Sequence, residues 1–446
     1  MIMSNDEQPD FRIEEVSPDL ALSGAIRLLQ ANRLDDAERI LRVLLENYPD
    51  VPEVLHFYGI LAHQQGNDEL AIESIEKAIA IAPDYADAYN NLGNIYNKAG
   101  KPEKAVEAYR RAIELNPANV AAYNNLGTVL KDLERFEEAV EAFSKAIELM
   151  PGNAELYRNF GNVFRKQGKF AEAARAYRNA ISLRPYRSED YESLCHVLYM
   201  QGLVEEALPT IRQWLEHDPT NPLALHRLHS YTGTDIPARA SNDYIRMTFD
   251  DFADSFDIVL KGLEYRAPGL VEQSLSALYD SACAELDVLD AGCGTGLCGE
   301  FLRPYAQRLS GVDLSAKMLE KARARGHYDE LFEAELTEFI GRHVEQFDLI
   351  VSADTLVYFG DLSQVFDSVI RALRRGGHFV FTVERTEEQL SAGYKINYHG
   401  RYSHTEDYLR RGLEAVGLVP IRIEREMLRY EAGLPVDGFL VVANRP

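Results

Sequence analysis

The segment Val288-Leu289-Asp290-Ala291-Gly292-Cys293-Gly294-Thr295-Gly296-Leu297 decides how the second half of the chain is interpreted. An apolar run ends in an acid and passes into a loop with three alternate glycines. Glycine permits a sharp turn and lets a ligand approach the main chain closely. A second apolar run, 309–312, ends at Asp313, seventeen residues after Gly296. An acid about 20 residues beyond a glycine loop is placed to bind a ribose diol.

Two phosphate-binding interpretations of this loop fit poorly. The dinucleotide fingerprint G-x-G-x-x-G requires a glycine where the sequence has Leu297. A P-loop requires a Gly-Lys-Ser/Thr sequence, and none follows here. A nucleoside ligand without a pyrophosphate fits the loop better.

From residue 287 onward, short apolar runs alternate with helical patterns, which predicts a parallel sheet with helices between its strands. We expect a helix to begin at about Leu297, directly after the loop. Ligands bind beyond the carboxyl ends of such strands, where the strand order reverses. Two further runs, 419–427 and 435–442, predict a terminal antiparallel hairpin. The expected parallel strands are 287–291, 309–313, 329–333, 347–352 and 376–383.

The sequence D-A-G-C-G-T-G at 290–296 resembles motif I of the class I S-adenosylmethionine (SAM) methyltransferases. The resemblance implies a Rossmann-like α/β domain with SAM as cofactor, Asp313 on the ribose and Met318 beside the adenine. Ordinary helix core is the alternative role for Met318. Glu335, after the third strand, is expected to accept a hydrogen bond from the adenine amino group. The expected cofactor-binding residues are Asp290, Ala291, Gly292, Cys293, Gly294, Gly296, Asp313, Leu314, Met318, Glu335, Leu336 and Ala353.

Candidate residues for the methyl acceptor lie in three places. In the family that the loop resembles, the helical segment before the first strand closes over the cofactor and lines the acceptor pocket, and Tyr265 follows that segment here. Tyr358, after the fourth strand, is expected to face the acceptor. The polar stretch 391–408 offers His399 or His404 as a general base and Arg401 as an anchor for an acidic acceptor. His404 can also be a structural residue beside a helix cap.

The fourth strand also argues against one class of substrate. Methyltransferases that act on nucleobase or amide nitrogens resemble one another in an Asn/Asp-Pro-Pro-aromatic motif at this position. This chain has no proline there. We therefore expect neither DNA adenine nor glutamine amides as acceptors, and we predict no metal site.

The first half of the chain repeats with a period of 34 residues. Small residues let paired helices approach closely, and a proline ends each unit before the next begins. The recurring prolines are Pro49, Pro83, Pro117, Pro151, Pro185 and Pro219, the alanines are Ala37, Ala71, Ala105, Ala139, Ala173 and Ala207, and the glycines are Gly59, Gly93, Gly127 and Gly161.

This pattern resembles the tetratricopeptide repeat (TPR), whose period is about 34 residues. Asn91, Asn125 and Asn159 also recur at this spacing, on the first helix of each unit, which faces the concave side in this family. The ladder is similar to that of the O-linked N-acetylglucosamine transferase superhelix, in which asparagine amides bind a peptide backbone. The resemblance implies a protein or peptide partner; solvated polar residues inherited with the repeat are the alternative.

The domain organisation follows from these patterns. We predict a disordered acidic tail at 1–17, six repeats at 18–221, a cap helix and linker at 222–240, and a SAM-dependent methyltransferase domain at 241–446. The G-R-Y-S-H-x-x-x-Y pattern at 400–408 resembles a little-characterised bacterial family of TPR-linked methyltransferases over nearly the whole chain.

Composition limits the partners and the location. The 446 residues carry a formal net charge of −24, which disfavours unaided binding to nucleic acid. No apolar run of about 18 residues occurs, so no membrane span is expected. The four cysteines have neither disulfide-framework nor metal-ligand spacing, and the first residues lack a signal-peptide pattern, which favours a cytoplasmic protein. The oligomeric state is not predicted.

Three hypotheses for function remain open at this point. The leading one is a SAM-dependent methyltransferase whose repeats recruit a protein or peptide. The second is a small-molecule methyltransferase that uses the repeats for docking or assembly. The third is a TPR scaffold whose methyltransferase domain binds SAM without turnover; the intact glycine loop and Asp313 argue against it.

Overall fold

A computed structural model describes residues 17–279, 282, 284–431 and 433–446. The chain divides into two compact units, Met1–Gln201 and Gly202–Pro446. The predicted acidic tail lies outside the described residues except for Ser17, which caps the first helix. The predicted domain limits at 221 and 240 stay predictions.

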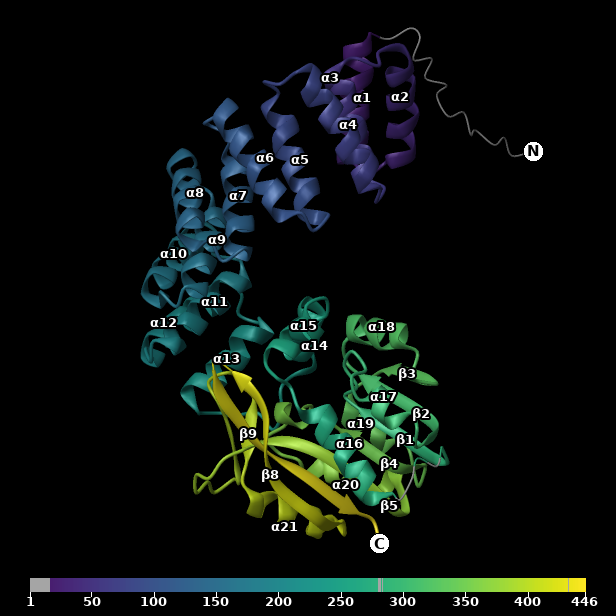
Figure 1. Ribbon diagram of the computed structural model, residues 1–446. Coiled ribbons are helices and arrows are strands. Elements are labelled where there is room, and N and C mark those ends of the chain that lie inside the picture. The colour runs from purple at the N-terminus through teal and green to yellow at the C-terminus, as the bar shows by residue number, and fades with distance from the viewer. Residues whose placement is uncertain (1–16, 280–281, 283, 432) are drawn as a thin grey trace, which may run out of the picture. The chain divides into compact units, whose positions relative to one another are not determined.

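The first unit consists of helices that follow one another along the chain (Figure 1). Their lengths alternate between 13 and 14 residues. The repeat fold predicted from the spacing is confirmed. Each alanine of the 34-residue pattern is fully buried between neighbouring helices. The helices are α1 Pro18–Gln30, α2 Leu34–Asn47, α3 Pro52–Gln64, α4 Asp68–Ile81, α5 Ala86–Lys98, α6 Pro102–Leu115, α7 Val120–Asp132, α8 Phe136–Leu149, α9 Ala154–Lys166, α10 Phe170–Leu183 and α11 Ser188–Met200.

The recurring glycines make room for a ring on the paired helix. A Cβ atom added at Gly127 would lie 2.7 Å from the ring of Phe143, sixteen residues later. Gly93 and Tyr109 repeat this contact one unit earlier, with a distance of 2.6 Å. These helices therefore approach each other at distances that no larger residue permits without repacking.

The second unit contains a nine-stranded sheet in which β3-β2-β1-β4-β5 are parallel and β9 joins β5 antiparallel. The strand order reverses between β1 and β4. The Rossmann-like sheet and its terminal antiparallel hairpin are therefore confirmed. The strands are β1 Leu286–Ala291, β2 Ala306–Asp313, β3 Glu330–Glu333, β4 Phe347–Ser352, β5 Leu373–Arg385, β6 Tyr394–Ile396, β7 Tyr402–His404, β8 Val419–Glu431 and β9 Leu434–Asn444.

Hydrophobic cores cover both faces of this sheet. Successive strand residues point to opposite faces, so Ile350 packs in one core while Leu349 and Val351 pack in the other. Helices α19, α20 and α21 complete the first core, and α16 and α17 complete the second (Figure 1). The helices of this unit are α12 Val204–His217, α13 Pro222–Thr232, α14 Asn242–Phe252, α15 Phe256–Gly262, α16 Ala267–Leu278, α17 Gly299–Leu302, α18 Ala316–Arg325, α19 Leu336–Gly341, η2 Leu356–Tyr358, α20 Ser363–Ala372 and α21 Glu406–Val416.

The helix after the glycine loop is shorter than expected, and the polar stretch 391–408 contains two strands that were not predicted. The helix expected from Leu297 is a four-residue turn of helix at Gly299–Leu302, because the chain bends through further turns after the loop. The polar stretch after β5 contains the short hairpin β6–β7, which extends the sheet. No described helix combines the length and apolar character that a membrane span requires.

We predict that Gly127→Ala lowers the free energy of unfolding by about 1–3 kcal/mol, because the new methyl group collides with the Phe143 ring. Gly152→Ala is the matched control, since a Cβ atom there meets no atom within 4 Å. Urea unfolding followed by circular dichroism measures both. Equal midpoints for the two variants would contradict the packing argument.

Candidate functional site

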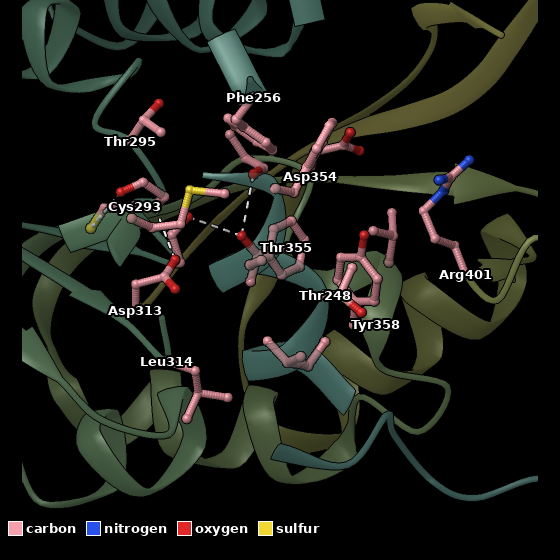
Figure 2. A pocket seen from close by; sticks show the side chains of 18 of the residues that line it. Thr248, Phe256, Cys293, Thr295, Asp313, Leu314, Asp354, Thr355, Tyr358 and Arg401 are labelled. Carbon is pink, nitrogen blue, oxygen red and sulfur yellow. Dashed lines mark hydrogen bonds between the residues drawn. The ribbon is translucent and has the colours of Figure 1, made fainter. Parts of the chain in front are cut away.

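A cavity of about 390 Å³ lies within the second unit, beyond the carboxyl ends of β1, β2, β3 and β4. This is the position that strand reversal predicts for a ligand. Three of the polar residues that line it come directly from these ends. Asp290 comes from β1. Asp313 comes from β2 and Asp354 follows β4 (Figure 2). The sheet thus brings together residues far apart in the sequence.

The three glycines of the loop have different reasons for being glycine. Gly292 has φ +82°, and a Cβ atom there would lie 2.2 Å from Oγ1 of Thr355. Gly296 has φ +85° and packs against Tyr328, and neither residue lines the cavity. Gly294 lines the cavity, and a Cβ atom there meets nothing within 4 Å. At position 294, glycine is therefore explained by the space that a ligand needs to approach the main chain closely.

The loop is held by the neighbouring strands. Gly292 and Cys293 donate their N–H groups to the carbonyl of Val312, at 2.8 and 3.0 Å. The N–H of Gly294 donates to Oδ2 of Asp313 at 2.9 Å, and Oδ1 of the same carboxylate accepts from the N–H of Ser315 at 2.9 Å. Each carboxylate oxygen of Asp313 can accept a further hydrogen bond.

Two buried carboxylates on this side of the cavity each keep one oxygen without a hydrogen-bond partner in the described structure: Oδ1 of Asp290 and Oε1 of Glu335. The other oxygen of Asp290 accepts from the Tyr328 hydroxyl at 2.7 Å. The nearest cation to Oε1 of Glu335 is Nη1 of Arg239, at 3.8 Å. Burial and, to a smaller extent, the nearby Asp313 carboxylate raise the pKa of Asp290 to about 7, although the Tyr328 hydrogen bond lowers it.

Helices α14 and α15 cover the cavity with aromatic side chains and are tied to the loop side by polar contacts. Phe249 and Phe256 line the cavity, and their rings meet edge to face at 6.1 Å. Oδ1 of Asp257 accepts from the Thr295 hydroxyl at 2.6 Å. Oδ1 of Asp250 accepts from the Ser315 hydroxyl at 2.5 Å. These contacts hold the helical segment over the glycine loop.

The other side of the cavity is built around two arginines, Arg429, which is buried, and Arg401, which is half-buried. Arg429 donates to Asp354 at 2.5 Å, to Glu431 at 2.7 Å and to Glu384. Arg401 donates to Glu384 at 2.6 Å and to Glu431 at 2.5 Å. Both guanidinium groups are therefore committed to protein carboxylates, so the expected use of Arg401 as an anchor for an acidic acceptor is not supported.

The two candidate histidines do not present a lone pair to the cavity. Nδ1 of His399 accepts from the N–H of Arg401 at 3.3 Å, so Nε2 carries the hydrogen, 3.5 Å from Glu384. His404 is fully buried, donates from Nε2 to the carbonyl of Gly360 at 3.0 Å and lies outside the cavity lining. Burial lowers the pKa of each imidazole to about 4. His404 therefore has a structural role and is not placed to act as the expected general base.

The linker before α14 forms part of the wall beside this charged side. The N–H of Ala240 donates to the carbonyl of Tyr358 at 2.8 Å, and Arg239 forms an antiparallel bridge with Phe359. The Tyr402 hydroxyl donates to the carbonyl of Pro237 at 2.9 Å. These contacts fix the chain around Tyr358, which lines the cavity.

Most of the residues proposed from the sequence lie around this one cavity. Ala291 does not line it; its carbonyl is taken by the Ser352 hydroxyl at 2.8 Å. Sequence reasoning missed Arg429 and Glu431, although polar residues two apart near the end of a strand face the same side. The predicted residues that line the cavity are Asp290, Gly292, Cys293, Gly294, Asp313, Leu314, Met318, Glu335, Leu336, Ala353, Tyr265, Tyr358, His399 and Arg401.

The asparagine ladder of the first unit is internally hydrogen-bonded. Asn91 donates to Nε2 of His56 at 2.8 Å, Asn125 to Oδ1 of Asn94 at 2.9 Å, and Asn159 donates to Oδ1 of an asparagine one repeat earlier at 3.0 Å. All three ladder side chains are half-buried. The amides thus join successive repeats, and each carbonyl oxygen can still accept from a bound peptide.

Comparison with known proteins supports both parts of the fold. The methyltransferase domain family model matches residues 289–381, and tetratricopeptide repeat models match 61–100, 86–119, 119–185 and 158–222. The malonyl-[acyl-carrier protein] O-methyltransferase of Salmonella typhimurium is 34% identical over 126 residues, 26% of this chain and 50% of that protein. The ubiquinone biosynthesis O-methyltransferase of Chelativorans sp. is 29% identical over 149 residues, 30% of this chain and 59% of that protein.

The chain spans about half the length of these curated relatives. The crystal structure of MamA is 26% identical and covers 36% of this chain and 94% of its own, with a TM-score of 0.35. The sequence matches, the sheet topology and the helical repeats together define the class of protein: tetratricopeptide repeats joined to a class I methyltransferase domain.

We predict that Asp290→Asn changes how stability depends on pH. Since the folded pKa of Asp290 is raised to about 7, its stabilising contribution is complete below the unfolded pKa and is lost as pH rises through 7. The variant cannot ionise, so between pH 5 and pH 8 its unfolding free energy should gain about 2–3 kcal/mol relative to the original protein. Urea unfolding at the two pH values measures this difference.

Asp329→Asn is the matched control for that measurement. Although burial opposes it, hydrogen bonds from the Leu309 N–H and from Arg303 lower the pKa of Asp329. Asp329 is therefore ionised in both states above pH 5, and its substitution should have the same effect at both pH values. A pH-independent effect of Asp290→Asn would show that Asp290 titrates normally.

Proposed function

We propose that this protein is a SAM-dependent methyltransferase whose repeats recruit the protein or peptide that it methylates. The observation that carries the proposal is the convergence of Asp290, Gly294, Asp313 and Glu335 on one cavity at the strand reversal. SAM supplies an activated methyl group on a sulfonium centre. The chain's own residues would bind and orient the cofactor and the acceptor, and would exclude water from them.

The unpaired polar atoms of the cavity fit the chemistry of this cofactor. Oδ1 of Asp290 would accept from the cofactor's ammonium group, because a buried carboxylate oxygen without a donor favours a cationic partner. Oε1 of Glu335 would accept from the adenine amino group. Asp313 would bind the ribose hydroxyls, and Met318, buried under the same cavity, would contact the base.

The enclosure of the cavity supports transfer rather than storage of the cofactor. Phe249, Phe252 and Phe256 from the covering helices line the side above the loop. Their apolar surface excludes water from the place where the acceptor must meet the methyl group. Such positioning is a major source of rate enhancement when the methyl donor is already activated.

The repeats support a macromolecular acceptor or partner. Asn91, Asn125 and Asn159 present amides at a regular spacing, and an amide that donates and accepts can bind a peptide backbone of any sequence. We infer that a partner segment binds along this ladder. Methylation of a small molecule, with the repeats used for assembly, is the second candidate, because the similar proteins bear the names of O-methyltransferases of malonyl-acyl-carrier protein and ubiquinone biosynthesis.

The first test incubates the purified protein with methyl-labelled SAM and a fractionated cell extract. We expect label in a discrete protein band, absent with Gly294→Val. That variant carries its side chain at a loop position with φ +54° that lines the cavity. Label in the small-molecule fraction would favour the second candidate. SAM binding without transfer to any fraction would instead support the scaffold hypothesis.

The second test concerns the cofactor side. Asp313→Ala should weaken SAM binding by roughly 2–3 kcal/mol, the scale of hydrogen bonds to a charged group. Isothermal titration calorimetry measures the change, with Asp329→Asn, outside the cavity, as the control. Unchanged affinity of Asp313→Ala would remove the ribose assignment.

The third test concerns the repeats. Replacing Asn91, Asn125 and Asn159 together by alanine should reduce labelling of the protein band at least tenfold, while calorimetry shows unchanged SAM affinity. Glu107→Ala with Glu141→Ala, exposed on the second helices of two repeats, is the control. Because the ladder also joins the repeats, circular dichroism must show equal helix content in all variants. Full labelling by a folded triple variant would exclude the ladder as the recruiting surface.

A further inference from the structure

The charged cluster beside the cavity leaves one carboxylate oxygen unused. Oδ2 of Asp354 accepts from Arg429 at 2.5 Å, and the Asp354 N–H donates to the Thr382 hydroxyl at 2.8 Å. Oδ1 is buried, belongs to a residue that lines the cavity, and has no hydrogen-bond partner in the described ranges. Leaving such an acceptor unpaired is unfavourable, so a donor from a bound molecule is the expected partner.

The backbone at Asp354 is held in an uncommon conformation. Its φ is +55°, in the left-handed region that most non-glycine residues avoid. Strain of this kind is retained where the surrounding structure requires a particular side-chain position. Here it places the carboxylate directly after β4, next to the strand reversal and beside Thr355, whose hydroxyl donates to the carbonyl of Gly292 at 3.1 Å (Figure 2).

We propose that Asp354 is the general base for methyl transfer and that the acceptor is an alcohol or an ammonium group. This rests on the proposed function. Oδ1 takes the acceptor's proton, the electron pair freed on oxygen or nitrogen forms the bond to the methyl carbon, and the donor's carbon–sulfur bond breaks with its electron pair on sulfur. Arg429 then holds the neutral carboxyl group through its other oxygen.

Neighbouring groups are less suited to this task. The Nδ1 lone pair of His399 is occupied by the Arg401 N–H, and His404 lies outside the cavity lining. Although burial opposes it, Arg401 and Arg429 hold the pKa of Glu431 at about 2, so this carboxylate stays ionised and bound to them. Burial raises the pKa of Asp354, against the effect of Arg429, which makes it a stronger base than an exposed aspartate.

The charge of the cluster selects the class of acceptor. Two guanidinium groups and three carboxylates leave a formal charge of −1, and both guanidinium groups already have carboxylate partners. A substrate carboxylate would add a second negative charge beside Oδ1, whereas an alcohol or ammonium group supplies the missing donor. The charged and titratable groups that face Asp354 are Arg429, Glu384, Arg401, Glu431, Tyr265 and Tyr358.

The first experiment identifies the product bond with the unaltered protein. The fraction labelled from methyl-labelled SAM is treated with alkali, and volatile labelled methanol is measured. Ethers and N-methyl groups survive this treatment, whereas methyl esters release methanol. We expect the label to remain. Release as methanol would overturn the inference while leaving the methyltransferase function intact; absence of any label would instead count against the function itself.

The second experiment uses Asp354→Asn, which keeps the shape of the side chain and a residue type that tolerates positive φ. Loss of a general base should slow transfer to the same acceptor by about 10²–10⁴-fold. The original protein's rate should rise with pH as Asp354 loses its proton, and the variant should lack that rise. SAM affinity by calorimetry should be unchanged, which separates this role from cofactor binding.

Glu384→Gln is the matched control, because it removes one carboxylate from the same cluster without reaching the cavity lining. It should lose less activity than Asp354→Asn and keep the pH-dependent rise. Equal rates and equal pH profiles for Asp354→Asn and the original protein would overturn the assignment. If Asp354→Asn fails to fold, the alkali experiment still tests the acceptor class.

Discussion

The glycine loop after β1 depends on hydrogen bonds from its own backbone to the end of β2. The Val312 carbonyl and the Asp313 carboxylate together accept from Gly292, Cys293 and Gly294. This fixes the loop and orients the Asp313 carboxylate at the same time, so neither can shift without the other. Thr355 fastens the same loop to the segment after β4. These hydrogen bonds therefore make the cavity wall rigid at the point where the strand order reverses.

Burial of charged groups is the second constraint. The two sides of the cavity differ in how their charged groups are paired. On the loop side, Asp290 and Glu335 are buried with an oxygen left unpaired, so a cationic or donor ligand completes them. On the opposite side, Arg401 and Arg429 are saturated by acidic side chains. A cofactor with donor groups at both ends suits the first side. The second side has its charges in place before any substrate arrives, as electrostatic preorganisation requires.

The fold was largely predictable, and so was the set of loop residues that line the cavity. The 34-residue period and the D-A-G-C-G-T-G segment are patterns of residues close together in the chain, so they can be recognised from the sequence alone. The partners on the side built around the two arginines lie far apart in the sequence: Asp354 follows β4, whereas Arg429 lies on β8. Only the sheet register brings them together. His404 looked catalytic because its neighbours are polar, but it donates to Gly360 inside the fold.

The linker contacts bear on the modularity of the chain. Pro237, Ala238 and Ala240 make backbone hydrogen bonds to residues around Tyr358 and Tyr402, and His226 of α13 donates to the Gly400 carbonyl at 2.7 Å. A methyltransferase domain excised at residue 241 would lose Ala240 and Arg239, which line the cavity beside Tyr358 and Glu335. The segment 222–240 therefore completes the wall of the cavity. Exchange of repeat arrays by recombination would preserve activity only if the breakpoint fell before α13.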